Sequence, residues 1–163
     1  MPSDYPAQIE VRSNEGQIVR YHLAPEFYAR SSKVPPSPGE RVVQRLDEGF
    51  AIFQVPASSS TVAEGSVLPV YRAQPSGMLA VATGRLWVRF AEGIDATQKR
   101  EKVEKVGCSL EELPPWTARG AWVRASSGKA VDALAAAAVL AGLPGVEHVE
   151  PQMLLSSLRK GLR

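Results

Sequence analysis

The chain has 163 residues and a net charge of +2, with 44% hydrophobic and 22% charged residues. This length suits one domain or two small ones, and this composition supports a packed core and argues against global disorder. No apolar run approaches the roughly 20 residues of a membrane helix, and the acidic, proline-bearing N-terminus does not have the pattern of a signal peptide. We therefore expect a cytoplasmic protein with no membrane partner.

Catalytic and metal-binding residue types are scarce. Cys108 is the single cysteine, so no internal disulfide forms, and His22 and His148 are the two histidines. Their separation argues against a zinc site and against a hydrolytic triad. No serine lies in a G-x-S-x-G turn, and no Walker pattern is present. The sequence predicts no catalytic residue, no metal site and no cofactor, so the chain is expected not to be an enzyme.

The first half of the chain is rich in turn signals. Nine of its 13 prolines lie at or before Pro75, and a proline-rich cluster spans residues 34–39. Between these breaks, runs of β-branched and aromatic residues predict five strands, at 9–13, 17–23, 41–46, 50–55 and 67–72. Asn14-Glu15-Gly16 predicts a hairpin between the first two strands. We interpret residues 1–75 as a small β-rich module of unknown role.

The second half begins with a strand and a helix. The alternation in residues 85–90 predicts a strand with Leu86 and Phe90 on one face and Trp87 on the other. Asp95 followed by Gln98 resembles a capping box, which predicts a helix over 96–106. The chain continues with predicted strands at 108–113 and 119–126, and Trp122 lies on the opposite face of the second of these from Val123.

A second helix and a last strand complete this half. Residues 128–143 are alanine-rich and predict a helix with Ser127 as its N-cap. Its expected buried stripe comprises Val131, Leu134, Ala135, Ala138 and Gly142. Residues 146–154 predict the last strand. The order β-α-β-β-α-β predicts a ferredoxin-like α+β domain over 76–154, an antiparallel sheet with two helices on one face, after the β-rich module and before a basic tail at 155–163.

The end of this half resembles a known family. The run from Leu140 through Leu-Pro-Gly-Val146-Glu-His-Val149-Glu150-Pro151 looks like the end of a subtilisin-type propeptide. The segment ATGRLWVRFAEGID looks like the entry into the prodomain of some bacterial subtilases. The resemblance covers about residues 79–154. Domains of this kind also form a family of protease inhibitors.

The resemblance implies a mode of action. A propeptide-like sheet packs on the protease surface, the C-terminal tail enters the substrate cleft, and the protease is inhibited and assisted in folding. The partner-binding tail residues would be Leu154, Leu155, Ser156, Ser157, Leu158, Arg159, Lys160, Gly161, Leu162 and Arg163. The expected partner is a subtilisin-family serine protease, or the protease domain of a longer precursor.

Two tryptophans are further candidates for partner binding. Trp87 and Trp122 are expected on the sheet face away from the helices, where either the N-terminal module covers them or they form an exposed patch for a partner. Trp116 follows Pro114-Pro115 nearby. Because residues 76–153 are charge-neutral and carry no basic-aromatic RNA-binding signature, we expect no nucleic acid partner. The alternative to a protease inhibitor is a cytoplasmic adaptor or regulatory scaffold.

Overall fold

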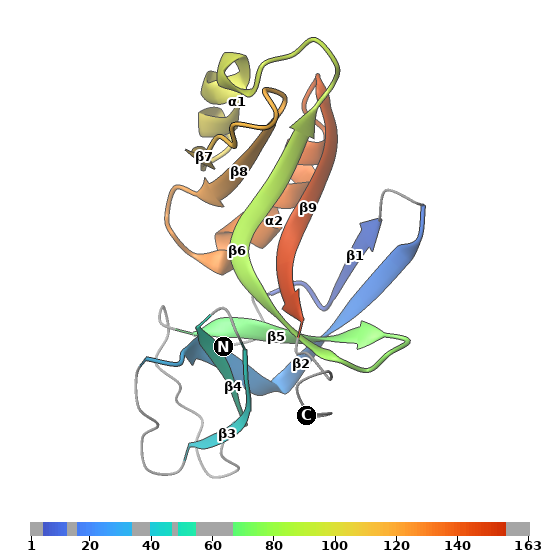
Figure 1. The fold of residues 1–163 in the computed structure, drawn as a ribbon, viewed down its shortest axis with the longest axis vertical. Coiled ribbons are helices and arrows are strands. Elements are labelled where there is room, and N and C mark those ends of the chain that lie inside the picture. Colours follow the sequence, from blue (N-terminus) through green and yellow to red (C-terminus); the bar gives the residue numbers. More distant parts are fainter. Residues whose placement is uncertain (1–4, 13–15, 34–39, 47–48, 55–66, 156–163) are drawn as a thin grey trace. The chain divides into compact units, whose positions relative to one another are not determined.

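The computed structural model describes residues 5–12, 16–33, 40–46, 49–54 and 67–155. Nine strands form one sheet with the order β3-β4-β2-β5-β6-β8-β7, in which β1 also pairs with β2 and β9 with β6 (Figure 1). The strands are β1 (Gln8–Arg12), β2 (Ile18–Ser31), β3 (Arg41–Arg45), β4 (Phe50–Gln54), β5 (Leu68–Gln74), β6 (Leu79–Phe90), β7 (Cys108–Glu112), β8 (Gly120–Ala125) and β9 (Val146–Leu155). A 3-10 turn (Ala96–Lys99) leads into α1 (Arg100–Lys105), and α2 (Ala130–Ala141) precedes β9. Within the described ranges, no helix is long and apolar enough to cross a membrane.

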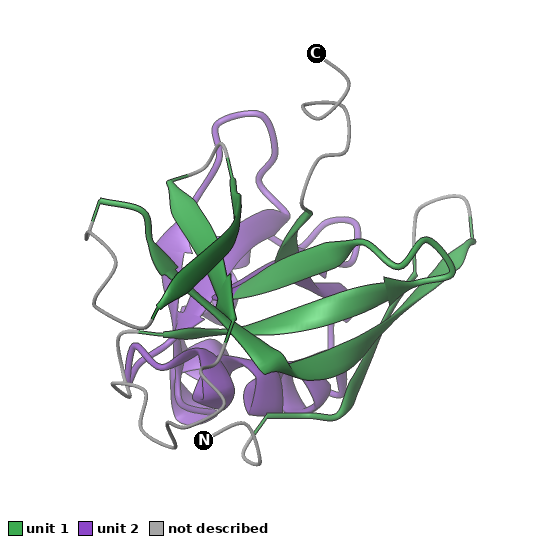
Figure 2. Ribbon diagram, turned by 90° about the horizontal axis from the view of Figure 1, so that it is seen from below, with its two compact units in different colours: residues 1–82, 153–163 green, residues 83–152 purple. Residues whose placement is uncertain are grey.

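The chain divides into two compact units (Figure 2). Unit 1 comprises residues 1–82 and 153–163, and unit 2 comprises residues 83–152. The strands β6 and β9 each supply residues to both units. Unit 1 therefore includes the end of β9, whereas the sequence predicts that the whole of this strand belongs to the C-terminal half.

The predicted ferredoxin-like fold is wrong. The strands of residues 79–155 do not form a separate sheet, because β6 pairs with β5 as well as with β8. The result is a large antiparallel sheet, and the described residues include only two short α-helices, of 6 and 12 residues. The alternation in 85–90 marks a strand, but it does not show that the strand begins at Leu79 and pairs with the preceding strand.

The first five strands lie where composition predicts them, with one difference in length. β1 and β2 pair antiparallel, which confirms the predicted hairpin. β2 continues to Ser31, well beyond residue 23, and so passes through Pro25. Its pairing with β5 shifts register between Leu23 and Tyr28, so the proline lies at an irregularity, where a missing N–H donor is tolerated.

Unit 1 contains a polar network beside an aromatic stack. The rings of Tyr28 and Phe53 are stacked with centroids 5.4 Å apart, and the guanidinium of Arg30 lies 4.5 Å from the Phe53 centroid. Glu40 accepts hydrogen bonds from the Tyr28 hydroxyl and from Arg30. Since Arg30 is only 9% exposed, its pairing with Glu40 avoids the cost of an isolated buried charge.

We expect the free energy of unfolding to fall at alkaline pH. Burial and the contact with Glu40 raise the pKa of Tyr28 to about 12, and burial also raises the pKa of Tyr71. Because these folded-state values exceed the usual tyrosine pKa of about 10, the stabilisation is complete below about pH 10 and is lost as the pH rises through the folded value. Urea unfolding at increasing pH measures this loss, and Tyr28→Phe should reduce it. An identical pH dependence in the variant would contradict this assignment.

One hydrophobic cluster holds unit 2 together. β6 contributes Leu86, Val88 and Phe90, all fully buried. The rest of the buried cluster comes from the 3-10 turn, both α-helices, β7 and β8, and comprises Ala96, Val103, Cys108, Ala121, Val123, Ala125, Ala133 and Leu140. The predicted capping box is confirmed, since Asp95 accepts from the Thr97 N–H and the side chain of Gln98 accepts from the Asp95 N–H.

The predicted details of α2 are partly wrong. Its N-cap is Lys129 rather than Ser127, whose hydroxyl instead bonds Asp132 and the Lys129 N–H. The buried side of the helix carries Ala130, Ala133, Leu134 and Leu140, whereas Ala135, Ala138 and Gly142 are exposed. Because small apolar residues occur all around this helix, periodicity does not define its buried side.

Gly84 lies within β6 and has a φ of +92°, a conformation that L-residues rarely adopt. A Cβ at this position would lie 3.1 Å from the Ala130 Cα. Backbone strain and this crowding together should make Gly84→Ala lower the free energy of unfolding by about 1–3 kcal/mol. Urea denaturation measures the loss. Gly142→Ala is the control, because Gly142 has a φ of −89° and a Cβ there would meet no atom closer than 3.6 Å. Equal stability of the two variants would contradict this reading of Gly84.

Candidate partner-binding face

Aromatic and charged side chains gather on the face of the unit 2 sheet opposite its hydrophobic cluster. Successive strand residues point to opposite faces, so Trp87 alternates with buried Leu86 and Val88, and Trp122 alternates with buried Ala121 and Val123. Loop residue Trp116 joins them by ring contact. We call this surface the tryptophan face; it comprises Arg85, Trp87, Arg89, Glu111, Trp116, Trp122 and Arg124.

The three indoles form one contact group. Trp87 and Trp122 are directly opposite each other in the β6–β8 pairing, and their rings meet edge to face with centroids 5.2 Å apart. Trp116 stacks on Trp87 at 5.5 Å with an interplanar angle of 23°. Trp87 and Trp122 are partly buried, whereas Trp116 is 72% exposed. Trp116 is therefore the indole most available to a partner.

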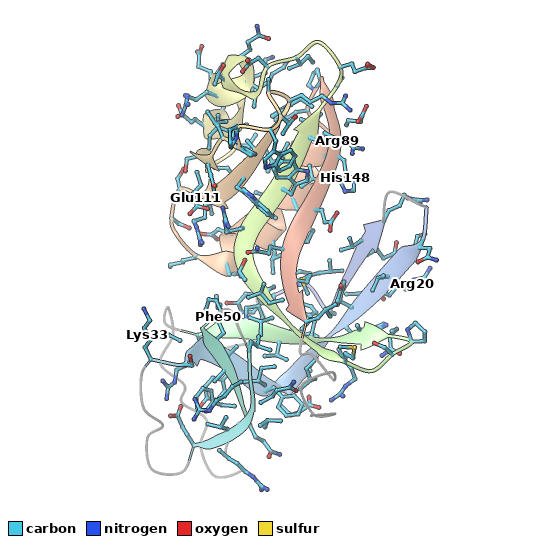
Figure 3. The ribbon with its side chains drawn as sticks, in the orientation of Figure 1. Arg20, Lys33, Phe50, Arg89, Glu111 and His148 are labelled. Carbon is cyan, nitrogen blue, oxygen red and sulfur yellow. The ribbon has the colours of Figure 1, made fainter. Side chains whose placement is uncertain are left out.

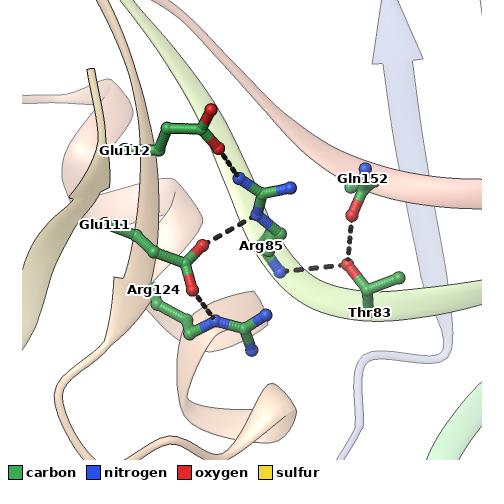
Figure 4. Close-up of polar contacts among 6 residues, drawn as sticks. All are labelled: Thr83, Arg85, Glu111, Glu112, Arg124 and Gln152. Atoms are coloured by element: carbon green, nitrogen blue, oxygen red, sulfur yellow. Dashed lines mark hydrogen bonds and ion pairs between the residues drawn. The ribbon is translucent and has the colours of Figure 1, made fainter. Parts of the chain in front are cut away.

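Arg85 is held by two carboxylates, those of Glu111 and Glu112 (Figure 4). Its guanidinium lies 4.4 Å from the Trp122 ring centroid. Its Nε donates to Glu111 at 2.7 Å and its Nη2 donates to Glu112 at 2.8 Å. Partly exposed ion pairs of this kind contribute only about 0–1 kcal/mol to stability. Their main consequence is orientation, because they fix Arg85 over the indole.

Glu111 is shared between two arginines. Its second carboxylate oxygen accepts from Arg124 Nε at 2.6 Å (Figure 4). Burial alone would raise the pKa of Glu111, but the hydrogen bonds and charges of Arg124 and Arg85 outweigh it and hold the pKa below the usual range. The carboxylate is thus ionised at neutral pH, and the network weakens only under acidic conditions.

A second ion-pair group extends the face along β6. Arg89, which Figure 3 labels with Glu111, donates from Nε to Glu147 at 2.8 Å. Arg119 lies 3.9 Å from the same carboxylate. The four arginines of these two groups therefore all have a glutamate partner.

The predicted tail residues lie largely outside the described part of the chain. Leu154 and Leu155 belong to β9, and the side chain of Leu154 packs against a hydrophobic cluster of unit 1. Ser156, Ser157, Leu158, Arg159, Lys160, Gly161, Leu162 and Arg163 lie outside the described residues. Any tail that enters a cleft therefore begins after Leu155.

The cysteine and the histidines lie on separate elements. Cys108 is fully buried on β7, and burial raises the pKa of its thiol, which disfavours the reactive thiolate. His148 Nε2 lies 3.0 Å from Glu150 Oε1 on β9, and exposed His22 lies on β2. In the parts of the chain that are described, no three His, Cys, Asp or Glu side chains are grouped to hold a metal ion.

The sequence pattern places Trp87 and Trp122 on one sheet face but gives no face for Trp116. Its position after Pro114-Pro115 is the signal that was available, since such a turn ends the strand and leaves the next side chain in a loop. The structure joins all three. In comparisons with family models, curated proteins and solved structures, nothing matches this chain.

Proposed function

We propose that this chain is a non-catalytic protein-binding module that docks on a subtilisin-family serine protease through the tryptophan face and inhibits it by occlusion. The observation that carries the docking proposal is the three-tryptophan group with its highly exposed member, Trp116. Tryptophan and arginine are the residues most enriched among those that dominate binding energy at protein interfaces. The choice of protease class rests on the propeptide-like residues from Leu140 to Pro151.

The charges on this face favour a protein over a nucleic acid. Affinity for nucleic acid comes largely from unpaired cations that displace counterions from phosphates. Here Arg85 and Arg124 share Glu111, and Arg89 bonds Glu147. Trp87 is also stacked against Trp116, so the side of the Trp87 ring that Trp116 covers is not open to a nucleic acid base. Interleaved charges of both signs suit the mixed surface of a folded protein.

Inhibition would be completed by the tail. Residues 156–163 follow β9 directly. A segment that binds in a protease cleft as an added strand gains main-chain hydrogen bonds while alternate side chains enter pockets. No bond is made or broken by this chain in such a mechanism.

The single cysteine fits a reducing compartment, and we place the protein in the cytoplasm.

Titration of the purified chain into a panel of subtilisin-family proteases tests this function. Cleavage of a fluorogenic peptide is the readout, and chymotrypsin-family proteases are the controls. We expect stoichiometric inhibition confined to the subtilisin family. Absence of inhibition across the panel, together with capture of a partner that is not a protease, would instead support the adaptor alternative.

A further inference from the structure

The position of Trp87 depends on Gly120, which pairs with Arg89 and so lies diagonally across from Trp87 in the β6–β8 pairing. Gly120 is the first residue of β8, and the indole of Trp87 lies directly over it. A Cβ at position 120 would lie 2.5 Å from Trp87 Cζ2 and 2.6 Å from Cη2. Real Cβ atoms do not approach other atoms this closely, so any side chain at position 120 must displace the ring. Gly120 does not have a positive φ, so backbone conformation does not require glycine here.

Displacement of Trp87 would spread to the other two tryptophans. Trp116 is a loop residue, and the ring contact that holds it is its stack on Trp87. Trp122 meets Trp87 edge to face from the neighbouring strand. Arg85, which lies over the Trp122 ring, is fixed by Glu111 and Glu112. In the β6–β8 pairing, Arg85 and Gly120 lie at opposite ends of this group. The tryptophan group is therefore supported at one end by an ion-pair network and at the other by the bare backbone of Gly120.

We propose that Gly120 is a positioning residue that presents Trp116 to the partner, acting through Trp87. The expected effect of Gly120 on inhibition rests on the proposed function. The positioning of Trp87 and Trp116 by Gly120 rests on the contacts within unit 2 alone. With Trp87 seated on the strand, Trp116 has a fixed platform before binding begins. A preorganised side chain loses less conformational freedom when the partner binds, which increases affinity.

The test is a double-mutant cycle between positions 120 and 87. The variants are Gly120→Ala, Trp87→Phe and the double variant, because phenylalanine lacks the indole atoms that a Cβ at position 120 would meet. Gly142→Ala is the matched control, since it adds the same methyl group where space is ordinary. Two readouts are taken: the near-UV circular dichroism of the coupled indoles, and the inhibition constant for a subtilisin-family protease. Far-UV circular dichroism verifies that each variant is folded.

We expect Gly120→Ala to change the near-UV spectrum and to weaken inhibition about threefold to tenfold, the loss that corresponds to one displaced aromatic stack. In the Trp87→Phe background the same substitution should have little further effect on either readout, and Gly142→Ala should have none. Equal losses in both backgrounds, or an unchanged near-UV spectrum in folded Gly120→Ala, would overturn the inference. If the unmodified chain inhibits no protease, the proposed function fails, and the spectroscopic cycle alone then decides the role of Gly120.

Discussion

Replacing Trp116 with alanine should weaken inhibition of a subtilisin-family protease by about 30-fold or more, while the free energy of unfolding changes by less than about 1 kcal/mol. The two effects separate because Trp116 is 72% exposed and contributes little to the core. In a complex, an exposed indole that becomes buried contributes a large apolar area. Inhibition constants and urea unfolding of the same preparations measure the two quantities.

The control for this prediction is Val139→Ala on α2. Val139 is also an exposed apolar side chain, 53% accessible, but it lies on a helix rather than on the tryptophan face. Its substitution should leave inhibition unchanged. A similar loss of inhibition in the two variants, or none in Trp116→Ala, would place the docking surface elsewhere on the chain.

Removal of residues 156–163 from the otherwise unchanged chain should weaken inhibition by about two orders of magnitude, while the truncated chain still binds the protease. Deletion of a peptide strand that lies in a cleft removes all of its main-chain hydrogen bonds to the protease. Each of these bonds makes a net contribution of about 0.5–1.5 kcal/mol to binding. The truncation should end after Leu155, because Leu154 packs against the unit 1 cluster and its loss would disturb the fold.

Calorimetric binding and inhibition assays distinguish the two parts of this prediction. The truncated chain is expected to bind the protease but to inhibit it about two orders of magnitude more weakly than the full chain does. Replacement of Arg159, Lys160 and Arg163 with glutamine in the full chain is the companion variant, since it removes the tail's positive charge at constant length. Undiminished inhibition by the truncated chain would contradict the role of the tail.

Local patterns predicted the strands and the first helix better than they predicted the sheet. Alternation identified β6 and β8, and Asp95 with Gln98 marked a capping box, which in the structure begins the 3-10 turn that leads into α1. The pairing of β6 with β5 was not predictable in the same way, because a strand's own residues do not show which strand lies beside it. For the same reason, the order of elements alone led to the wrong fold class.

Only part of the candidate site could be predicted from the sequence. The phase of the two strands placed Trp87 and Trp122 on one face, and the structure brings their rings together. The contribution of Trp116 depends on the path of the loop after β7, and the periodicity of hydrophobic residues in the sequence does not predict the path of a loop. The role of Gly120 is not predictable from the sequence, because the need for glycine arises only when the Trp87 ring lies over it.

The three tryptophans of the chain all lie on the tryptophan face, so they also provide the most direct test of it. We would label the chain with 5-fluorotryptophan, assign the three fluorine resonances with single Trp→Phe variants, and add a catalytically inactivated subtilisin-family protease. Docking through this face predicts that the Trp116 resonance shifts or broadens at stoichiometric protease, with smaller changes at Trp87 and Trp122. Formation of an inhibited complex with all three resonances unchanged would contradict the account.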